Sequence, residues 1–181
     1  PAIDVSLEIL NRDGVLQRMM NNLDDLYIMS QPPQNIDLTD DVFLDNPLVM
    51  IAAASNPLCK QHSLTLSALK EQRFILREQG SGTRMGVDQF FKKYKWRPNI
   101  RMELGSNEAV KEAVAGGLGI GVVSQHALHG HQKEHGVAMV RVQGFPIRSS
   151  WHIVHAKRKK LSPIAAAFKK HLIQEIKRTH A

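Results

Sequence analysis

The alternation of strand-like and helix-like segments is the feature that most constrains how this chain folds. Short apolar runs that fit buried strands occur at Leu48–Ala54, Arg73–Arg77 and Ile120–Val123. Between them, Thr83–Lys95 and Ser106–Ala115 carry apolar residues at helical spacing. Strands that alternate with helices form parallel sheets covered by helices, so the sequence predicts an α/β fold. Ligands of such sheets bind beyond the carboxyl ends of the strands, so the strand-to-helix loops are the expected binding sites.

The remaining segments continue this alternation. At the start, Val5–Ile9 alternates apolar and polar residues with the period of a strand. Because a natural chain rarely begins inside its first strand, we expect further sequence upstream of Pro1. Asp13 is the expected cap of the helix that follows. Further strands are expected at Leu26–Met29, Val42–Leu44, Asn99–Leu104, Val137–Val142 and Ser150–His155, and further helices at Asn11–Leu23, at Ser63–Glu71 and from Pro163 onward.

Composition narrows the class of protein. A chain of 181 residues fits one large domain or two small ones, and 43% hydrophobic with 23% charged residues indicates a packed core. The formal net charge of +7 is compatible with nucleic acid, with small anions or with solubility alone. The single cysteine, Cys59, excludes an intrachain disulfide and favours a reducing compartment. No signal peptide and no run of about 20 apolar residues is present, so we expect a cytoplasmic protein without a membrane segment.

The loop Arg77–Arg84, with the sequence REQGSGTR, is the most informative segment. A strand ends there, two glycines turn the chain, and a helix begins with hydroxyl side chains. A helix N-terminus exposes unpaired N–H groups and partial positive charge, so Arg77, Ser81, Thr83 and Arg84 form a candidate site for a carboxylate or phosphate. The alternative is a capped helix after a glycine turn, with both arginines in solvent. The loop lacks the Gly-Lys-Ser/Thr of a P-loop.

A second strand-to-helix loop holds Ser106 and Asn107, either of which can cap the following helix and face a ligand. Taken alone, this loop favours capping. The glycines of Gly116–Gly121 end a helix and open a strand, whereas a dinucleotide fingerprint ends a strand and opens a helix. We therefore interpret them as a helix stop and a place of close packing.

Other constellations predict no chemistry. His126, His129, His131 and His135 lie close together in sequence, but Gly130 interrupts their helical spacing and no cysteine or carboxylate set completes a metal site. The basic run Lys157–Lys160 favours a solvated turn over a phosphate contact, because no DNA-binding motif accompanies it. Neither Cys59 nor the adjacent Asp24 and Asp25 form an identifiable nucleophile–base or acid–base pair. We expect no metal, no cofactor and no enzymatic activity.

Several segments of the chain are informative through their order and spacing. They are Asn21–Met29, Leu48–Ile51 with Ser55–Leu58, Arg77–Arg84, and Leu104–Lys111 continuing through Ala115–Ser124. Taken together, these segments resemble the effector domains of LysR-type transcription regulators, and the resemblance extends over nearly the whole chain. Within the family, the Arg77–Arg84 loop and the following SNEAVKEAV and GLGIG segments are most similar to the CbbR-like group, which controls carbon fixation and inorganic-carbon uptake.

The resemblance implies two Rossmann-like subdomains of periplasmic-binding-protein type with an effector cleft between them. Two crossover segments, near Met50–Ala53 and Ser150–Val154, would join subdomain I (residues 1–50 plus 151–181) to subdomain II (residues 51–150). The family's first strand and helix, with a Ser/Thr-rich loop that lines the cleft, and its DNA-binding winged helix-turn-helix are not in this sequence. DNA contact is therefore expected only through that other domain, and homodimers or homotetramers are expected.

The expected function is to sense a small anionic metabolite and to transmit binding to the DNA-binding domains. Effectors of the CbbR-like group are phosphorylated or carboxylated metabolites such as ribulose bisphosphate, phosphoglycolate or 2-oxoglutarate. The alternatives are a solute-binding protein for a small anion and, less favoured by the residues, an enzyme that uses the same cleft. The expected effector contacts are Arg77, Ser81, Thr83, Arg84, Ser106 and Asn107, followed by Asn11 and Ser30 at the strand ends of subdomain I.

Overall fold

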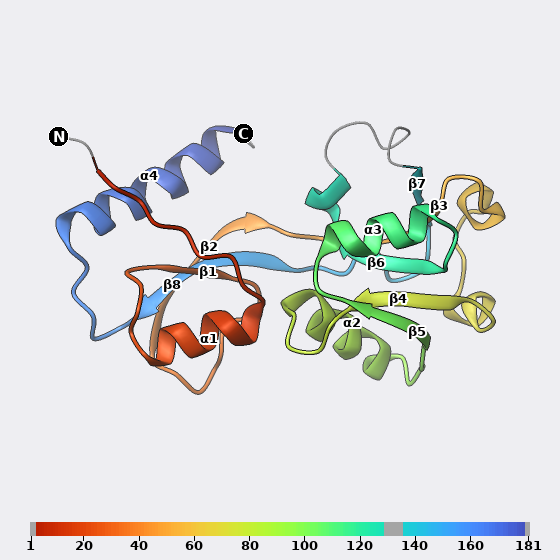
Figure 1. Cartoon of the computed structure of the whole chain (residues 1–181), viewed down its shortest axis with the longest axis horizontal. Helices are drawn as coiled ribbons and strands as arrows, with labels where there is room; N and C mark the ends of the chain where they lie inside the picture. The colour runs from red at the N-terminus through yellow and green to blue at the C-terminus, as the bar shows by residue number, and fades with distance from the viewer. Residues whose placement is uncertain (1–2, 129–135, 180–181) are drawn as a thin grey trace.

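The computed structural model describes residues 3–128 and 136–179, and their elements form two halves that lie side by side (Figure 1). Each half has its own sheet. The first half contains a three-stranded sheet of order β1-β8-β2, and the second contains a five-stranded sheet of order β5-β4-β6-β3-β7. Helices and strands mix in both halves, as predicted for an α/β fold. In the described part of the chain, no helix combines the length and apolar character needed to cross a membrane.

The first half is built on β8, because β1 and β2 both pair with it in antiparallel register. Ile153 and Val154 of β8 are fully buried, and Val154 packs with Met19, Tyr27 and Met29 in a small apolar core. Helix α1 supplies Met19 to this core. The elements of the first half are α1 (Arg12–Met20), β1 (Tyr27–Met29), β2 (Leu38–Asp45), β8 (Ser150–Ala156) and α4 (Pro163–Thr179).

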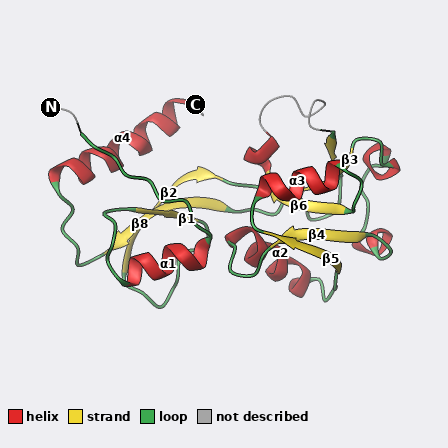
Figure 2. Cartoon of the chain, in the orientation of Figure 1, coloured by secondary structure: helices red, strands yellow, loops and turns green. Residues whose placement is uncertain are grey.

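The second half contains the larger core, divided by its sheet into two layers. Successive side chains of a strand point to opposite faces, so Phe74 and Leu76 pack on the α2 side while Ile75 packs on the α3 side. Figure 2 shows these two helices on opposite sides of the sheet. The elements are β3 (Leu48–Ala53), the 3-10 helices η1 (Pro57–Lys60) and η2 (Leu66–Leu69), β4 (Arg73–Arg77), α2 (Gly82–Lys93), β5 (Asn99–Leu104), α3 (Asn107–Ala115), β6 (Ile120–Ser124), η3 (Gln125–Leu128) and β7 (Val137–Met139).

The strand directions correct the prediction of parallel sheets. Strand β4 is parallel to β5 and β6, but β3 is antiparallel to both β6 and β7, and the smaller sheet is antiparallel throughout its described pairs. Alternating strands and helices predict only the parallel part, β4-α2-β5-α3-β6. Strand β3 enters the sheet from the other half instead of through a helical crossover, so it runs in the opposite direction.

The chain passes between the halves twice, at adjacent places. It leaves β2 at Asp45 and enters β3 at Leu48, and it returns between Ile147 and Ser150. The two passages are hydrogen-bonded, since Leu48 N donates to Ile147 O at 2.9 Å. The first passage lies a few residues before Met50–Ala53, since Met50–Ala53 already belongs to β3.

Four local predictions need correction. Residues 3–10 form no strand, and their apolar side chains are exposed, Ile9 by 83%. A strand needs a hydrogen-bonding neighbour, and sequence periodicity does not supply one. Asn11, not Asp13, caps α1. The predicted Val42–Leu44 strand exists within β2, but Val42 is 60% exposed, and the helix predicted at Ser63–Glu71 is only the short η2.

Candidate functional site

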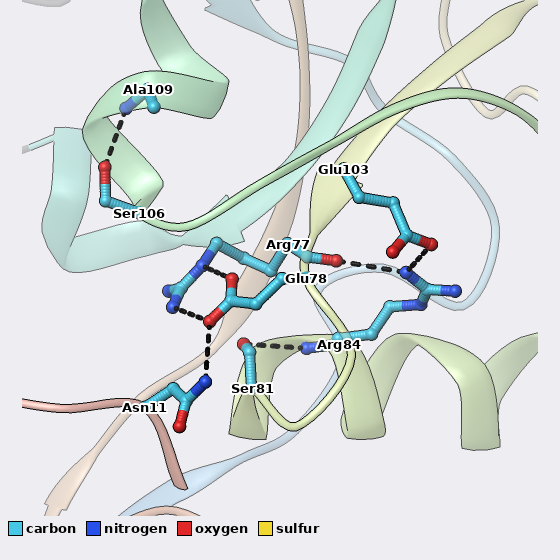
Figure 3. A network of polar contacts seen from close by, with 8 residues as sticks. All are labelled: Asn11, Arg77, Glu78, Ser81, Arg84, Glu103, Ser106 and Ala109. Atoms are coloured by element: carbon cyan, nitrogen blue, oxygen red, sulfur yellow. Dashed lines mark hydrogen bonds and ion pairs between the residues drawn. The ribbon is translucent and has the colours of Figure 1, made fainter. Parts of the chain in front are cut away.

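The two halves meet where the N-terminus of α1 faces the loop between β4 and α2. Asp13 N donates to Gly80 O at 3.2 Å across this boundary. Asn11 makes two contacts there: its Oδ1 accepts from Gly14 N at 3.0 Å, which caps α1, and its Nδ2 donates to Glu78 Oε1 at 3.2 Å. We call the group Asn11, Asp13 and Ser30 with residues 77–82 the junction. Figure 3 shows the side chain of Asn11, the N-cap of α1, pointing at Glu78.

Arg77 and Glu78 form a two-pronged ion pair at the end of β4. Arg77 Nε donates to Glu78 Oε2 at 2.8 Å, and Nη2 donates to Oε1 at 3.1 Å. Burial acts to raise the pKa of the Glu78 carboxyl, but the hydrogen bonds from Arg77 and Asn11 outweigh burial and hold the pKa below its ordinary value. Glu78 is therefore a carboxylate at neutral pH, bound by donors from both halves of the molecule.

The start of α2 lies against the first half at very short range. Ser81 is the N-cap, 2% exposed, and its Oγ accepts from Arg84 N at 3.3 Å. Gly80 has a φ of +84°, and a β-carbon there would press on the Asp13 carboxylate. A β-carbon on Gly82 would overlap the hydroxyl of Ser30. The two glycines therefore let the positive end of the α2 dipole approach α1 and β1 directly.

Arg84 lies on the flank of α2, where it is only 5% exposed. Its guanidinium donates to both carboxylate oxygens of Asp88, at 2.9 and 3.0 Å, and to Glu103 Oε1 at 2.6 Å. It also donates to Arg77 O at 3.1 Å. Burial acts to lower the pKa of Arg84, but the bonds to Glu103 and Asp88 raise it. Two carboxylates thus neutralise the charge of Arg84. A contact between Arg84 and an effector stays a prediction. Thr83 beside it is buried, and its effector contact also stays a prediction.

The second predicted loop lies next to the first. Glu78 N donates to Leu104 O at 3.0 Å, which joins the end of β4 to the end of β5. Ser106 caps α3 as predicted, since its Oγ accepts from Ala109 N at 3.0 Å. Asn107 Oδ1 is buried and, among the residues that the structure describes, is the one buried side-chain oxygen or nitrogen without a hydrogen-bond partner. An unpaired buried acceptor is costly, so Asn107 remains a candidate for contact with a ligand or with water.

The structure therefore brings most of the predicted residues together. Glu78 is not among the predicted site residues, because a carboxylate repels an anion and the other groups of this loop attract one. The available signal was a carboxylate inside an otherwise basic loop, adjacent in sequence to Arg77. Its partner Asn11 is 67 positions away, so the contact has no local sequence signature.

A cavity of about 480 Å³ lies elsewhere, between the loop after β1 and the start of β8. None of its lining residues is a predicted site residue. Asp37 and Asp40 line it, and Asp40 Oδ1 is 2.6 Å from His152 Nδ1. Among the described residues, no arginine or lysine lines this cavity, whereas the junction has Arg77 and the N-terminus of α2, so we place the candidate anion site at the junction.

The described residues contain no group of three or more potential metal ligands. His126 lies 2.7 Å from Asp45 O through its Nε2, whereas His129, His131 and His135 fall outside the described residues. In the basic turn, Lys157 pairs with Asp37 at 3.3 Å and Lys159 donates to Asp24 O at 2.7 Å. These contacts connect the turn to Asp37 and Asp24 of the first half.

Comparison with known proteins gives a consistent assignment. Residues 1–177 match the family described as the LysR substrate binding domain. The chain is 45% identical over 168 residues to the HTH-type transcriptional activator CmpR of Synechocystis, covering 93% of this chain and 55% of CmpR. It is 41% identical over 172 residues to a RuBisCO operon transcriptional regulator of Acidithiobacillus ferrooxidans, covering 95% of this chain and 56% of that protein. The chain thus spans just over half the length of these relatives.

Two solved structures of regulatory domains are similar to this chain. The regulatory domain of CcmR from Synechocystis, in complex with 2-PG, superposes with a TM-score of 0.92 at 42% identity, covering 96% of this chain and 84% of that one. The effector binding domain of QuiR in complex with shikimate gives a TM-score of 0.82 at 20% identity, covering 93% and 79%, which shows the shared fold alone.

Proposed function

The chain belongs to the LysR substrate-binding domain family, and from this premise we propose that it senses a small phosphorylated or carboxylated metabolite for a transcription regulator. The predicted resemblance to the CbbR-like group is confirmed, because RuBisCO operon regulators and CbbR proteins are among its relatives. The family assignment favours the regulator over the solute-binding alternative. The regulator's DNA contact and its assembly as a homodimer or homotetramer are part of the proposal.

One observation carries the proposal: donors from both halves converge on a single carboxylate. Asn11 from the first half and Arg77 from the second both donate to Glu78, beside the N-terminus of α2. The junction can therefore bind an anion with a guanidinium, an amide and helix N–H groups at once. The complex of CcmR with 2-PG supports a small anionic ligand for a close relative.

Residue roles follow from position. Arg77 is the proposed anchor for the ligand's charge, with Asn11 and Ser30 contributing from the first half. Ser81 orients the N-terminus of α2, and Ser106 and Asn107 flank it from the next loop. Thr83 and Arg84 are proposed as ligand contacts from the first turn of α2.

The proposed mechanism is a shift between two relative orientations of the halves. A ligand that touches both halves favours the orientation in which it makes both contacts, and it can shift the equilibrium only by its difference in affinity. The orientation would then be transmitted through the assembled regulator to its DNA-binding domains.

The test is a thermal-shift screen with 2-phosphoglycolate, 2-oxoglutarate, ribulose bisphosphate and inorganic phosphate. A ligand at about 100 times its dissociation constant should stabilise the fold by roughly 2.7 kcal/mol. Arg77→Gln should remove the shift. Arg73→Gln is the matched control, because Arg73 is exposed at the opposite end of β4 and should leave the shift unchanged. The proposal is wrong if none of the four anions stabilises the unsubstituted chain.

A further inference from the structure

We infer that Glu78 is a built-in competitor of the effector, a carboxylate that occupies the donors an anionic ligand needs and that must move aside when the ligand binds. The inference rests on the proposed function and extends it, because it names a residue that sets both the affinity and the charge class of the effector.

The geometry places the Glu78 carboxylate where a ligand anion would bind. Arg77 Nε and Nη2 lie 2.8 and 3.1 Å from its two oxygens, the fork-to-fork geometry of arginine with a bound carboxylate. Asn11 Nδ2 approaches the same Oε1 from the other half at 3.2 Å. A ligand carboxylate or phosphate at this position would therefore take over contacts that Glu78 now makes.

The charges around the junction give the competition its strength. Arg77 carries one positive charge and Glu78 cancels it. The nearby cation Arg84 is paired with Asp88 and Glu103, at 2.9 and 2.6 Å. An arriving anion thus meets a site whose nearby arginines are neutralised, and it gains a full ion pair only by displacing the Glu78 carboxylate.

Displacement also has a mechanical consequence. The Asn11–Glu78 bond joins residues of the two halves, and Asp13 N–Gly80 O is its neighbour across the same boundary. A ligand that displaces Glu78 replaces the Asn11–Glu78 hydrogen bond by contacts between Asn11 and the ligand, which have a different length. Binding is thereby coupled to the relative position of α1 and α2, as a sensor requires.

Competition with Glu78 favours ligands that carry more than one negative charge. A monocarboxylate offers Arg77 and Asn11 no more than Glu78 already does, and Glu78 is held beside them by the chain. A dianionic phosphate, or a ligand with two acidic groups, adds contacts with the α2 N-terminus that Glu78 does not make. The structure therefore assigns the effector to multiply charged anions and disfavours simple monocarboxylates.

Glu78→Gln is the decisive variant, because glutamine keeps the size of the side chain and an oxygen for Asn11 while it removes the competing charge. Isothermal titration with 2-phosphoglycolate should show at least roughly tenfold tighter binding than in the unsubstituted chain, since the fraction of molecules with free donors rises. Glycolate, the matching monocarboxylate, should become a detectable ligand. Glu71→Gln is the control, since Glu71 is exposed just before β4, at the opposite end of that strand from Glu78, and its substitution should leave both affinities unchanged.

The outcomes separate the two proposals. If the unsubstituted chain binds 2-phosphoglycolate and Glu78→Gln binds it equally or more weakly, Glu78 is not a competitor and the proposed function stands. If neither protein binds any of the four anions of the screen, the proposed function fails and the inference fails with it. Circular dichroism establishes that each variant is folded. Should Glu78→Gln not fold, Glu78→Ala must show the same gain in affinity for 2-phosphoglycolate for the inference to survive.

Discussion

Ser30 and Gly82 lie so close together that a β-carbon on residue 82 would overlap the Ser30 hydroxyl. Ser30 directly follows β1 in the first half, and Gly82 is the first residue of α2 in the second. The two halves can therefore come this close at the junction only because residue 82 has no side chain. No other residue type permits this approach without a shift of backbone or of Ser30.

Gly82→Ala should move the two halves apart at the junction. We expect the affinity for 2-phosphoglycolate to fall at least roughly tenfold, because a hydrogen bond to a charged group contributes about 1.5–3 kcal/mol and about 1.4 kcal/mol corresponds to a factor of ten. Titration calorimetry measures it. Gly105→Ala is the matched control, since a β-carbon there meets no atom within 4 Å. Equal affinities for the two variants would show that the close approach of Ser30 has no role in binding.

The loop before α3 separates capping from ligand contact. Ser106→Ala removes the bond to Ala109 N and should cost about 0.5–2 kcal/mol of stability in urea unfolding. Asn107→Ala removes a buried acceptor that has no partner in the described structure, so its stability should change by less than about 0.5 kcal/mol. A loss for Asn107→Ala as large as that for Ser106→Ala would mean that Asn107 has a structural partner.

Gly121 of β6 is predicted to be essential for the packing of α3. A β-carbon there would lie 2.9 Å from Val110 Cγ1 and 3.0 Å from Val114 Cγ2, both fully buried. Gly121→Ala should therefore destabilise the fold by about 1–3 kcal/mol, measured by urea unfolding. Gly116→Ala, whose new carbon would meet nothing closer than 3.5 Å, is the control and should be near neutral. Similar values for both would contradict the packing argument.

Acid should weaken the first half through Asp24. Arg18 donates to both oxygens of Asp24, at 2.8 and 2.7 Å, and these hydrogen bonds lower the pKa of Asp24 below its ordinary 3.8. A lowered pKa contributes stability that is complete above the unfolded-state value and is lost as pH falls through the folded-state value. Asp24→Asn should therefore lower the melting temperature at pH 7, and the difference from the unsubstituted chain should shrink below about pH 4.

Asp25→Asn is the control for this effect. Its side chain is 66% exposed, and its carboxylate is as far as 4.0 Å from the Lys159 ammonium. The substitution should therefore have little influence on the melting temperature at either pH. If Asp24→Asn and Asp25→Asn give the same pH profile, the Arg18–Asp24 pair is not the source of acid sensitivity.

The parallel core of the second half and the cap at Ser106 could be predicted from sequence, and the partners of the charged residues could not. Ser106 caps its helix as its loop indicated, because a capping bond reaches only three residues along the chain, and Ser81 caps α2 by a bond of the same span. Arg84 was expected to face a ligand. Its partner Glu103 lies on β5, 19 positions away, and only the parallel pairing of β4 with β5 brings that carboxylate to α2.

The same distinction explains the N-terminal segment and the junction. Val5–Ile9 has apolar residues at alternate positions, but a strand also needs a hydrogen-bonded partner strand, and residues 3–10 form no strand in the structure. The order of most elements, the cap at Ser106 and the resemblance to the LysR family follow from the amino-acid sequence, since these depend on short-range hydrogen bonds and on hydrophobic periodicity. The meeting of Asn11, Arg77 and Glu78 has no sequence signature, because that contact depends on how the two sheets are joined at residues 46–47 and 147–150 in the folded molecule.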